Sequence, residues 1–398
     1  MSLASQPSLH SLPSLDVHNL NTSPSLHQCI TTIKGHFSSS SSAYVSALAV
    51  DGDSLYIASS DGSIRLWELD RARGNQEEQQ DDDSCSGSSS TTVADTNSSV
   101  KSLLATCNGG LLLSSHQDGK IRAWRAGSRR RDGATRQLVL RAVLPTAVDR
   151  LRTCLLPWSY VEIRRHRRCT WVHHVDAVTA LAVSPDGALL YSASWDRSIK
   201  VWRLPDFRCV ESIAAAHDDA INALAVSPDG RVYTGSADKK IKAWTRGPGQ
   251  KKHALVGTLE RHRSAVNALA LGANGKVLYS GACDRSIVVW ESAADGRMEA
   301  TGTLRGHARA ILCLAAAGEL VCSGSADRTV RVWRRGGAES SGYTCLAVME
   351  SHGAGVKSLA LVRGRDDGSC SSEGSSALVC SGALDGDVKI WSVFILCL

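Results

Sequence analysis

The chain lacks any long hydrophobic run. No apolar stretch reaches the ~18 residues that a helix needs to cross a bilayer. Residues 1–26 are rich in Ser, Leu, Pro and Asn, but they lack the charged start and the apolar core of a signal peptide. We therefore expect no transmembrane segment, a disordered tail over residues 1–26, and a location in the cytoplasm, the nucleus or both.

Cysteine pairs with metal-binding spacing are also missing. The 13 cysteines are odd in number and scattered, and none forms a Cys-x-x-Cys motif. A disulfide framework and a zinc ribbon are therefore not indicated, and a reducing compartment is expected. His166, Cys169, His173 and His174 lie close together, but the arginines at 164, 165, 167 and 168 would repel a cation. We expect no metal and no cofactor.

Phenylalanine and tyrosine are scarce, whereas tryptophan is not. The sequence has three Phe and seven Tyr against ten Trp, and most of the Trp share one spacing. An Asp precedes a Trp by six residues seven times, in the pairs Asp61/Trp67, Asp118/Trp124, Asp196/Trp202, Asp238/Trp244, Asp284/Trp290, Asp327/Trp333 and Asp385/Trp391. A spacing that recurs seven times indicates a repeat protein rather than isolated sites.

A histidine and a hydroxyl residue accompany most of these pairs. The His lies four residues before the first β-branched residue of the repeat, at His174, His217, His262, His307 and His352, and at His36 if residues 37–44 form a longer loop. The second copy has Thr96 instead. A Ser or Thr stands four residues before the Asp in six copies, and the first copy has Ile57. No Ser/His/Asp or Cys/His set lies outside the repeat, so no catalytic residue can be nominated.

One complete copy, residues 174–202, shows the local structure that the repeat predicts. Alternating runs at 178–183 and 189–194 flank the turn sequence SPDG at 184–187, and a third run, 199–202, ends at Trp202. Period-two alternation punctuated by turn residues predicts a three-stranded antiparallel meander.

Together these motifs resemble the WD40 family. The resemblance implies an all-β fold, a seven-bladed β-propeller of four-stranded blades, over residues 27–398. It implies that each Asp bonds its His, that the His bonds the Ser or Thr, and that this hydroxyl bonds the Trp indole. It also implies that the segment before each His forms the outer strand of the preceding blade. Residues 27–34 should then complete the last blade and close the ring, with the apolar residues 393–398 as the alternative for the same edge.

Three insertions interrupt the expected repeats. We place them at about residues 68–99, 127–172 and 363–376, and the first, which is acidic and then Ser/Thr-rich, should be a mobile loop. Residues 160–173 alternate and should supply the outer strand of blade two. Because blade two lacks the His, we expect its polar network to be incomplete and the blade to be less rigid.

The sequence around the second insertion resembles one particular group of WD40 proteins. The segments SYVEIRRHRRCTWVHHVDAV (159–178), SASWDRSIKVW (192–202) and AHDDAINALAVSPDG (216–230) resemble the plant JINGUBANG-type WD40 proteins. This resemblance implies a plant regulatory protein that works by binding other proteins.

The same insertion is strongly basic. Residues 127–172 contain eleven arginines and three acidic residues, a net charge of +8 against +6 for the whole chain. These arginines, among them Arg129, Arg130 and Arg131, fit a solvated loop, a surface for an acidic partner, or contacts to a nucleic-acid backbone. Aromatic residues for base stacking are few there, so sequence-specific nucleic-acid binding is not indicated.

In WD40 proteins, partners commonly dock on the face that bears the Asp turns. The matching positions lie three and five residues after the His and one before the Asp, and they give Tyr44, Lys101, Trp195, Asn222, Asn267, Leu312, Lys357 and Leu384. Trp195 is the most informative of them, because an exposed Trp is unfavourable unless a partner covers it. The alternative is that Trp195 folds over its own blade.

The leading functional hypothesis is a non-enzymatic scaffold that binds a protein partner and no small-molecule substrate. The alternative is a substrate receptor of a ubiquitin ligase. That subset usually carries Trp-Asp-x-Arg, and none of the seven repeat Trp is followed by Asp. A nucleic-acid-associated or enzymatic propeller is a third class, for which no residues can be named.

Overall fold

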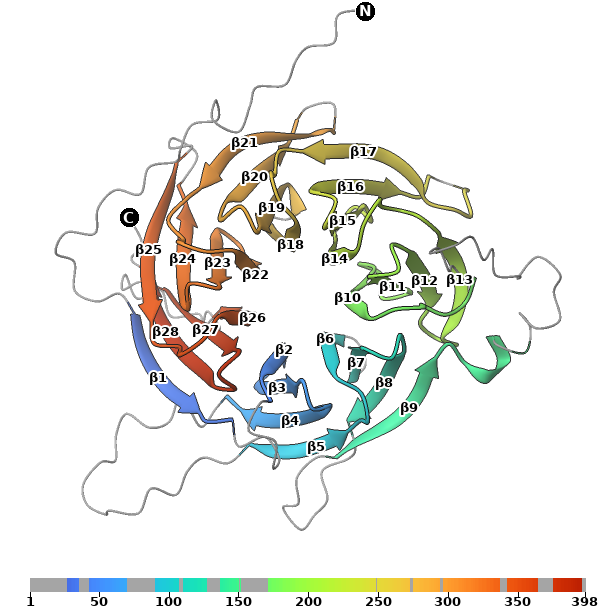
Figure 1. Ribbon diagram of the computed structural model, residues 1–398, viewed down its shortest axis with the longest axis horizontal. Helices are drawn as coiled ribbons and strands as arrows, with labels where there is room; N and C mark the ends of the chain where they lie inside the picture. Colours follow the sequence, from blue (N-terminus) through green and yellow to red (C-terminus); the bar gives the residue numbers. More distant parts are fainter. Residues whose placement is uncertain are drawn as a thin grey trace, which may run out of the picture.

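The computed structural model of the protein describes residues 27–35, 43–69, 90–106, 110–126, 137–149, 151, 171–247, 249–272, 275–293, 296–336, 342–363 and 375–395. Within these ranges the chain forms seven four-stranded antiparallel sheets, which stand as blades around a common centre (Figure 1). The predicted seven-bladed, all-β propeller is confirmed. The same ranges contain no helix with the length and hydrophobicity that a bilayer crossing requires.

The first three blades each use four strands that are consecutive in the chain. Blade one contains β2 (Val45–Asp51), β3 (Ser54–Ser59), β4 (Ser63–Glu68) and β5 (Thr91–Asp95). Blade two contains β6 (Val100–Thr106), β7 (Leu111–His116), β8 (Ile121–Ala126) and β9 (Leu138–Leu144). Blade three contains β10 (Val178–Val183), β11 (Leu189–Ser194), β12 (Ile199–Arg203) and β13 (Arg208–Ile213).

Blades four to six follow the same order. Blade four contains β14 (Ile221–Val226), β15 (Val232–Ser236), β16 (Lys240–Thr245) and β17 (Ala254–Glu260). Blade five contains β18 (Val266–Gly272), β19 (Val277–Ala282), β20 (Ile287–Ser292) and β21 (Met298–Leu304). Blade six contains β22 (Ile311–Ala317), β23 (Leu320–Ser325), β24 (Thr329–Arg335) and β25 (Tyr343–Glu350).

Blade seven combines the two ends of the described chain. It contains β26 (Val356–Arg363), β27 (Ser375–Ala383), β28 (Val388–Ile395) and, as its outer strand, β1 (His27–Ile33) (Figure 1). The antiparallel register joins His27 to Val393 and Ile33 to Val388. The amino-terminal segment therefore closes the ring, as predicted. Residues 393–395 do not compete for this edge, because they extend the neighbouring strand β28.

Two expected insertions are shorter than the repeat pattern indicated. Residues 91–95, placed in the first insertion, form β5 and pair with β4. The prediction that residues 160–173 form the outer strand of blade two was wrong, because β9 pairs with β8 from Ile121↔Leu144 to Ala126↔Leu138. In both blades this segment is the fourth strand, and it pairs with the otherwise open edge of the third strand. Residues 70–89, 127–136 and 152–170 lie outside the described residues.

The hydrophobic core lies between neighbouring blades. One cluster joins Tyr191 and Val201 of blade three to Ile221 and Trp244 of blade four, and equivalent clusters join the other blades. A sheet that is apolar on both faces must be covered on both faces, and in a ring each blade covers the next. The ring thus explains why the second strand of a blade, such as β11, β19 or β23, is buried on both faces and why the repeat Trp are buried.

Candidate functional site

The polar residues of the repeat form a continuous hydrogen-bonded set in blades three to six. In blade four, Trp244 Nε1 donates to Thr234 Oγ1 (3.0 Å), which lies 2.8 Å from His217 Nε2, and His217 Nδ1 lies 2.8 Å from Asp238 Oδ2. The same order joins Trp202–Ser192–His174–Asp196, Trp290–Ser280–His262–Asp284 and Trp333–Ser323–His307–Asp327. These are the contacts that the resemblance implied.

Charge within the network is concentrated on the carboxylates. Burial by itself would raise the pKa of Asp238, but hydrogen bonds from His217 and from the backbone N–H groups of Lys240 and Asp218 together lower it to about 2. Burial lowers the pKa of His174, although Asp196 opposes this effect. The lowered pKa favours the neutral imidazole of His174, in which Nδ1–H donates to Asp196 and Nε2 accepts from Ser192 Oγ. The network is structural, because its atoms are all engaged with one another.

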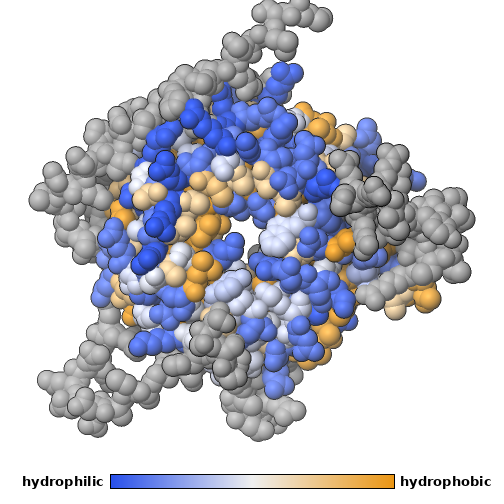
Figure 2. All heavy atoms as spheres, viewed as in Figure 1, coloured by the Kyte–Doolittle hydropathy of each residue, from blue (hydrophilic) through white to orange (hydrophobic). Residues whose placement is uncertain are grey.

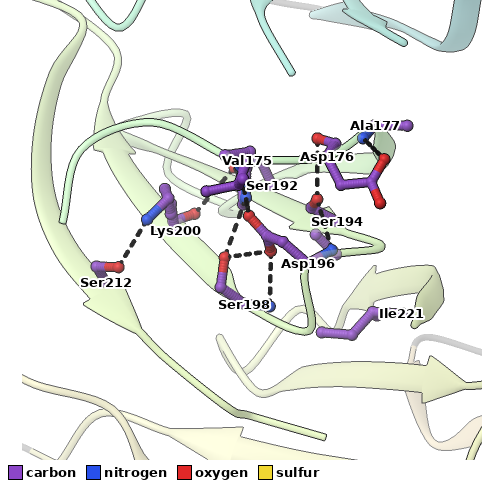
Figure 3. A network of polar contacts seen from close by, with 12 residues as sticks. Val175, Asp176, Ala177, Ser192, Ser194, Asp196, Ser198, Lys200, Ser212 and Ile221 are labelled. Atoms are coloured by element: carbon purple, nitrogen blue, oxygen red, sulfur yellow. Dashed lines mark hydrogen bonds and ion pairs between the residues drawn. The ribbon is translucent and has the colours of Figure 1, made fainter. Parts of the chain in front are cut away.

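Figure 3 shows how this network fixes the turn of blade three. Asp196 Oδ2 accepts from the backbone N–H of Val175 at 2.9 Å, and Asp196 Oδ1 accepts from Ser198 N at 2.9 Å and Ser198 Oγ at 2.6 Å. The carboxylate thus joins the connection before the first strand to the turn between the second and third strands. These turns and connections lie on one side of the ring, which we call the Asp-turn face.

Blades seven and one depart from the full pattern. In blade seven the His352–Ser381–Trp391 contacts are present, but His352 Nδ1 lies 3.5 Å from Asp385 Oδ2. In blade one, Ile57 replaces the hydroxyl residue, and Asp61 Oδ1 accepts from Ser63 N at 2.9 Å. His36 lies outside the described residues.

Blade two has a different and more complete network than the sequence indicated. Trp124 Nε1 donates to Ser114 Oγ (2.8 Å), Ser114 Oγ lies 2.8 Å from His116 Nε2, and His116 Nδ1 lies 3.1 Å from the carbonyl oxygen of Ser98. Residues two apart on a strand share a face, so His116 reaches Ser114 from the same strand. Burial lowers the pKa of His116 to about 4. Asp118 instead binds Arg122 Nη2 at 2.9 Å. The expectation of an incomplete network was thus wrong for the Trp–Ser–His part, which His116 completes, and is confirmed for Asp118, which stays outside it.

A buried basic residue four positions after the Asp was not predicted. Lys200 is fully buried, and its Nζ donates to the carbonyl of Trp171 (3.1 Å) and to Ser212 Oγ (2.8 Å) (Figure 3). In blades four and seven, Lys242 and Lys389 donate to the carbonyl of the residue directly before the repeat His, Ala216 and Ser351. The available signal was Lys or Arg two residues before six of the seven repeat Trp.

Trp195 brings together three of the predicted partner-binding residues. Its side chain is 40% exposed on the Asp-turn face, and Nε1 donates to Asn222 Oδ1 at 3.2 Å. Lys101 Nζ lies 5.7 Å from the centroid of the Trp195 ring, within cation–π range. Trp195 therefore reaches from blade three toward blades two and four, rather than folding over its own blade. Burial, and then the charge of Lys357, lower the pKa of Lys101.

The two predicted asparagines also connect blades. Asn222 Nδ2 donates to the carbonyl of Val266 (3.1 Å), and Asn267 Nδ2 donates to the carbonyl of Ile311 (2.8 Å). Each amide thus ties the innermost strand of its blade to that of the next blade. Both asparagines therefore have a structural role, because they join neighbouring blades.

The remaining predicted residues lie around the same inner rim. A methyl group at Gly355 would lie 3.3 Å from Leu312 Cδ1 and 3.6 Å from Leu384 Cδ1, so the two leucines approach each other there. Leu384 is 44% exposed, Lys357 is exposed and Tyr44 is half-buried. Figure 2 shows an opening at the centre of the ring that both hydrophilic and hydrophobic residues border. The inner rim thus offers a mixed surface.

Arg129, Arg130 and Arg131 lie outside the described residues, but the ends of their connection are placed. β8 begins just after the Asp118 turn and ends at Ala126, and β9 begins at Leu138. This connection therefore leaves and re-enters the sheet on the face opposite the Asp turns.

No metal or enclosed catalytic site emerges from the described residues. In that part of the chain, no three His, Cys, Asp or Glu residues are grouped so that they could hold a metal ion, and His166 and Cys169 lie outside it. A groove of about 710 Å³ lies between β17 and β21, with Val256, Met298 and Arg297 in its lining. None of the predicted site residues lining the Asp-turn face contributes to this groove.

The sequence model of the family described as "WD domain, G-beta repeat" matches residues 27–68, 166–203, 207–245, 253–291, 298–334 and 343–392, more than half of the chain. Blade two lies between the first and second of these segments, which agrees with its altered network.

Similar proteins match over only part of their length. The chain is 29% identical to "Transducin beta-like protein 3" of Bos taurus over 162 residues, 37% of this chain and 20% of that protein. It is 31% identical to "Protein ROOT INITIATION DEFECTIVE 3" of Arabidopsis thaliana over 160 residues, 36% of this chain and 35% of that protein. It is 26% identical to "Pre-mRNA-processing factor 17" of Homo sapiens over 134 residues, 33% of this chain and 22% of that protein. The matches thus span well under half of each relative.

Among solved structures, the WD40 beta propeller domain of Doa1 is similar over nearly all of both chains. The TM-score is 0.62, and the match covers 92% of this chain and 96% of that chain at 22% identity. At this identity the similarity concerns the fold alone.

Proposed function

Because the chain belongs to the WD40 repeat family, whose propellers typically serve as scaffolds for protein interaction, we propose that it is a non-enzymatic scaffold or adaptor. It binds a protein partner on the Asp-turn face, at the inner rim around Trp195. The partner presents a surface that is both acidic and apolar.

The exposed Trp195 is the observation that carries this proposal. A Trp that is 40% exposed is unfavourable in water, yet Asn222 and Lys101 hold its ring in place on the face. A pre-positioned aromatic ring loses little conformational entropy when a partner covers it. Tryptophan is also enriched among the residues that dominate binding energy. Lys101 adds positive charge beside the ring, and Lys357 lies near enough to Lys101 to lower its pKa.

We place this scaffold in plant regulatory signalling, in the cytoplasm, the nucleus or both. The support is the resemblance of residues 159–178, 192–202 and 216–230 to JINGUBANG-type proteins and the similarity to a protein of Arabidopsis thaliana whose name refers to root initiation. A transcriptional or signalling regulator is a partner that fits such a role.

Long-range electrostatic attraction of the acidic partner is the role that we assign to Arg129, Arg130 and Arg131. The +8 charge of residues 127–172 stands on a chain that is otherwise near neutral. The basic insertion takes part in binding the partner, and these arginines mainly steer the approach of its acidic surface.

The test begins with a pull-down on the full chain, with mass spectrometry to identify the partner, and then measures binding kinetics. Trp195→Ala should raise the dissociation rate by about 30-fold, which corresponds to ~2 kcal/mol. Trp171→Ala is the matched control, because Trp171 is 45% exposed and lies against the outer strand β13, where its carbonyl accepts from Cys209 Sγ. Charge reversal at Arg129, Arg130 and Arg131 should slow association at low salt and matter less at high salt.

Two results would contradict the proposal. Unchanged rates in both variants would remove the inner rim and the basic insertion from the interface. Recovery of cullin adaptors as stoichiometric partners would instead support a substrate receptor of a ubiquitin ligase, despite the absence of Trp-Asp-x-Arg after the repeat Trp.

A further inference from the structure

The residue after the Asp adopts the same unusual backbone conformation in all seven blades. Its φ lies between +67° and +97° throughout. It is glycine in blades one, two and seven, whereas blades three to six have Arg197, Lys239, Arg285 and Arg328. A left-handed backbone is unfavourable for any residue with a Cβ atom. Four adjacent blades therefore carry a basic side chain where glycine would be less strained.

Close packing explains why two of these positions are occupied by glycine. A Cβ atom at Gly62 would lie 2.0 Å from the carbonyl oxygen of Thr96, and one at Gly119 would lie 2.6 Å from that of His174. Glycine is required in these two turns for space as well as for φ. Blades three to six leave room for a side chain, and in each of them it is Arg or Lys.

Positive charge is most concentrated on blades five and six. Five exposed arginines lie on the connections and turns of their Asp-turn face, and we call them the basic turn surface: Arg263, Arg285, Arg305, Arg309 and Arg328. In the described part of the chain, no ion pair joins any of them to a carboxylate. Their charge is available to a partner.

The carboxylates near this surface do not neutralise it. Asp284 and Asp327 are bound to His262 and His307 and accept from backbone N–H groups. Glu260 pairs with Lys240 at 3.0 Å. Among the described carboxylates near this surface, Glu350 at the end of β25 then remains. Blades three and four differ, because the exposed Asp176, Asp218 and Asp219 accompany Arg197 and Lys239 on the same turns.

The chemistry of this surface indicates an acidic peptide. Guanidinium groups bind carboxylates through two parallel hydrogen bonds, which a lysine cannot do. Leu312 and the 44% exposed Leu384 lie beside the surface at the inner rim and suit an aliphatic side chain. The described turns of blades five and six contain no Trp, Tyr or Phe on which a nucleic-acid base could stack.

We propose that the basic turn surface binds an extended segment of the partner that is rich in Asp and Glu and carries an aliphatic residue toward Leu312 and Leu384. This inference rests on the proposed function, because it names the chemistry of the partner that docks on the Asp-turn face.

The first experiment measures fluorescence anisotropy of a short fluorescein-labelled peptide of Asp and Glu with a central Leu, added to the full chain at physiological salt. The double variant Arg285→Gly/Arg328→Gly should weaken binding by about 10-fold or more, because it removes two charge-assisted contacts. Glycine suits the left-handed backbone, so the variant should keep or raise its melting temperature. A loss of affinity then cannot be attributed to unfolding.

The matched control is Arg197→Gly/Lys239→Gly, which removes two charges at the same positions of blades three and four. It should weaken binding less than about twofold, and a peptide with Asn and Gln in place of Asp and Glu should not bind. Equal losses from the two double variants would show that only net charge matters and would overturn the inference. Equally tight binding of an oligo-dT strand, lost in Arg285→Gly/Arg328→Gly, would overturn it in favour of a nucleic-acid site.

The second experiment repeats the kinetics with the partner from the pull-down. Faster dissociation in both Trp195→Ala and Arg285→Gly/Arg328→Gly supports the inference. Faster dissociation in Trp195→Ala alone contradicts the basic turn surface and leaves the proposed function intact. No change in either variant removes the Asp-turn face from the interface and contradicts both.

Discussion

At the scale of single residues, the equivalent Asp of each repeat contributes differently to stability in different blades. Asp238 is 5% exposed in its side chain and accepts hydrogen bonds from His217 and from two backbone N–H groups. Asp118 is 28% exposed and pairs with Arg122, while His116 depends on the Ser98 carbonyl instead. Asp238→Ala should therefore lower the free energy of unfolding by about 3–5 kcal/mol, and Asp118→Ala by ~1 kcal/mol or less.

Chemical denaturation of the two variants checks this ordering. Removing Asp238 leaves a buried imidazole N–H without its acceptor, whereas removing Asp118 leaves Arg122 able to reach solvent. Similar losses in both variants would show that the His116 network of blade two depends on Asp118 after all.

His116 should make the stability of the protein depend on pH. Burial lowers its pKa from 6.5 to about 4, so the folded protein keeps it neutral. Between these two values the unfolded chain binds a proton that the folded chain does not, so the free energy of unfolding falls as the pH drops from 6.5 to 4. The contribution of this one residue is at most roughly 3 kcal/mol.

Urea titrations of the wild type and of His116→Gln over that pH range measure the effect. Burial also lowers the pKa of His174 and His352, so the wild type loses stability for several reasons. The difference between the two proteins isolates His116, and the variant should show the shallower pH dependence. Parallel curves would mean that His116 titrates normally in the folded state.

At the scale of elements, the inner three strands of each blade were easier to predict than the fourth. The strands that flank the SPDG turn of blade three carry alternating apolar residues and local turn signals, and β10 and β11 form there. β5 (Thr91–Asp95) is short and mostly polar, and it follows a long acidic and Ser-rich stretch. β9 (Leu138–Leu144) lies among arginines. An outer strand has one free edge and an exposed face, so its composition carries little of the usual signal.

At the scale of the whole molecule, ring closure is the step with the longest separation in the chain. β1 covers β28, and Ile33 packs in a cluster with Val388, Ile390, Val45 and Trp67 from blades seven and one. Deletion of residues 1–26 should leave the melting temperature nearly unchanged, because the described fold begins at His27. Deletion of residues 1–34 should lower it by about 5 °C or more, because blade seven loses its outer strand and part of this cluster.

Thermal melts followed by circular dichroism test the two deletions side by side. Equal melting temperatures would mean that another segment can replace β1 at the edge of β28. The shorter deletion serves as the control for nonspecific effects of removing residues from the amino-terminus.

Periodic residues let the sequence by itself determine the number of repeats and the turn of each Asp. The resemblance to the WD40 family then implied seven blades and, in blades two to seven, the hydroxyl partner of each buried Trp. These features depend on spacing along one blade, and spacing is visible in a linear chain. Only the tertiary structure decided how His116 takes the place of the missing His, which strands cover blades one and two, and that Trp195 reaches Asn222 and Lys101. The Trp195 contacts form because the closed ring brings neighbouring blades together. The His116 contacts and the outer strands β5 and β9 depend on which segment fills an open place within its own blade, and the repeat spacing does not specify that segment.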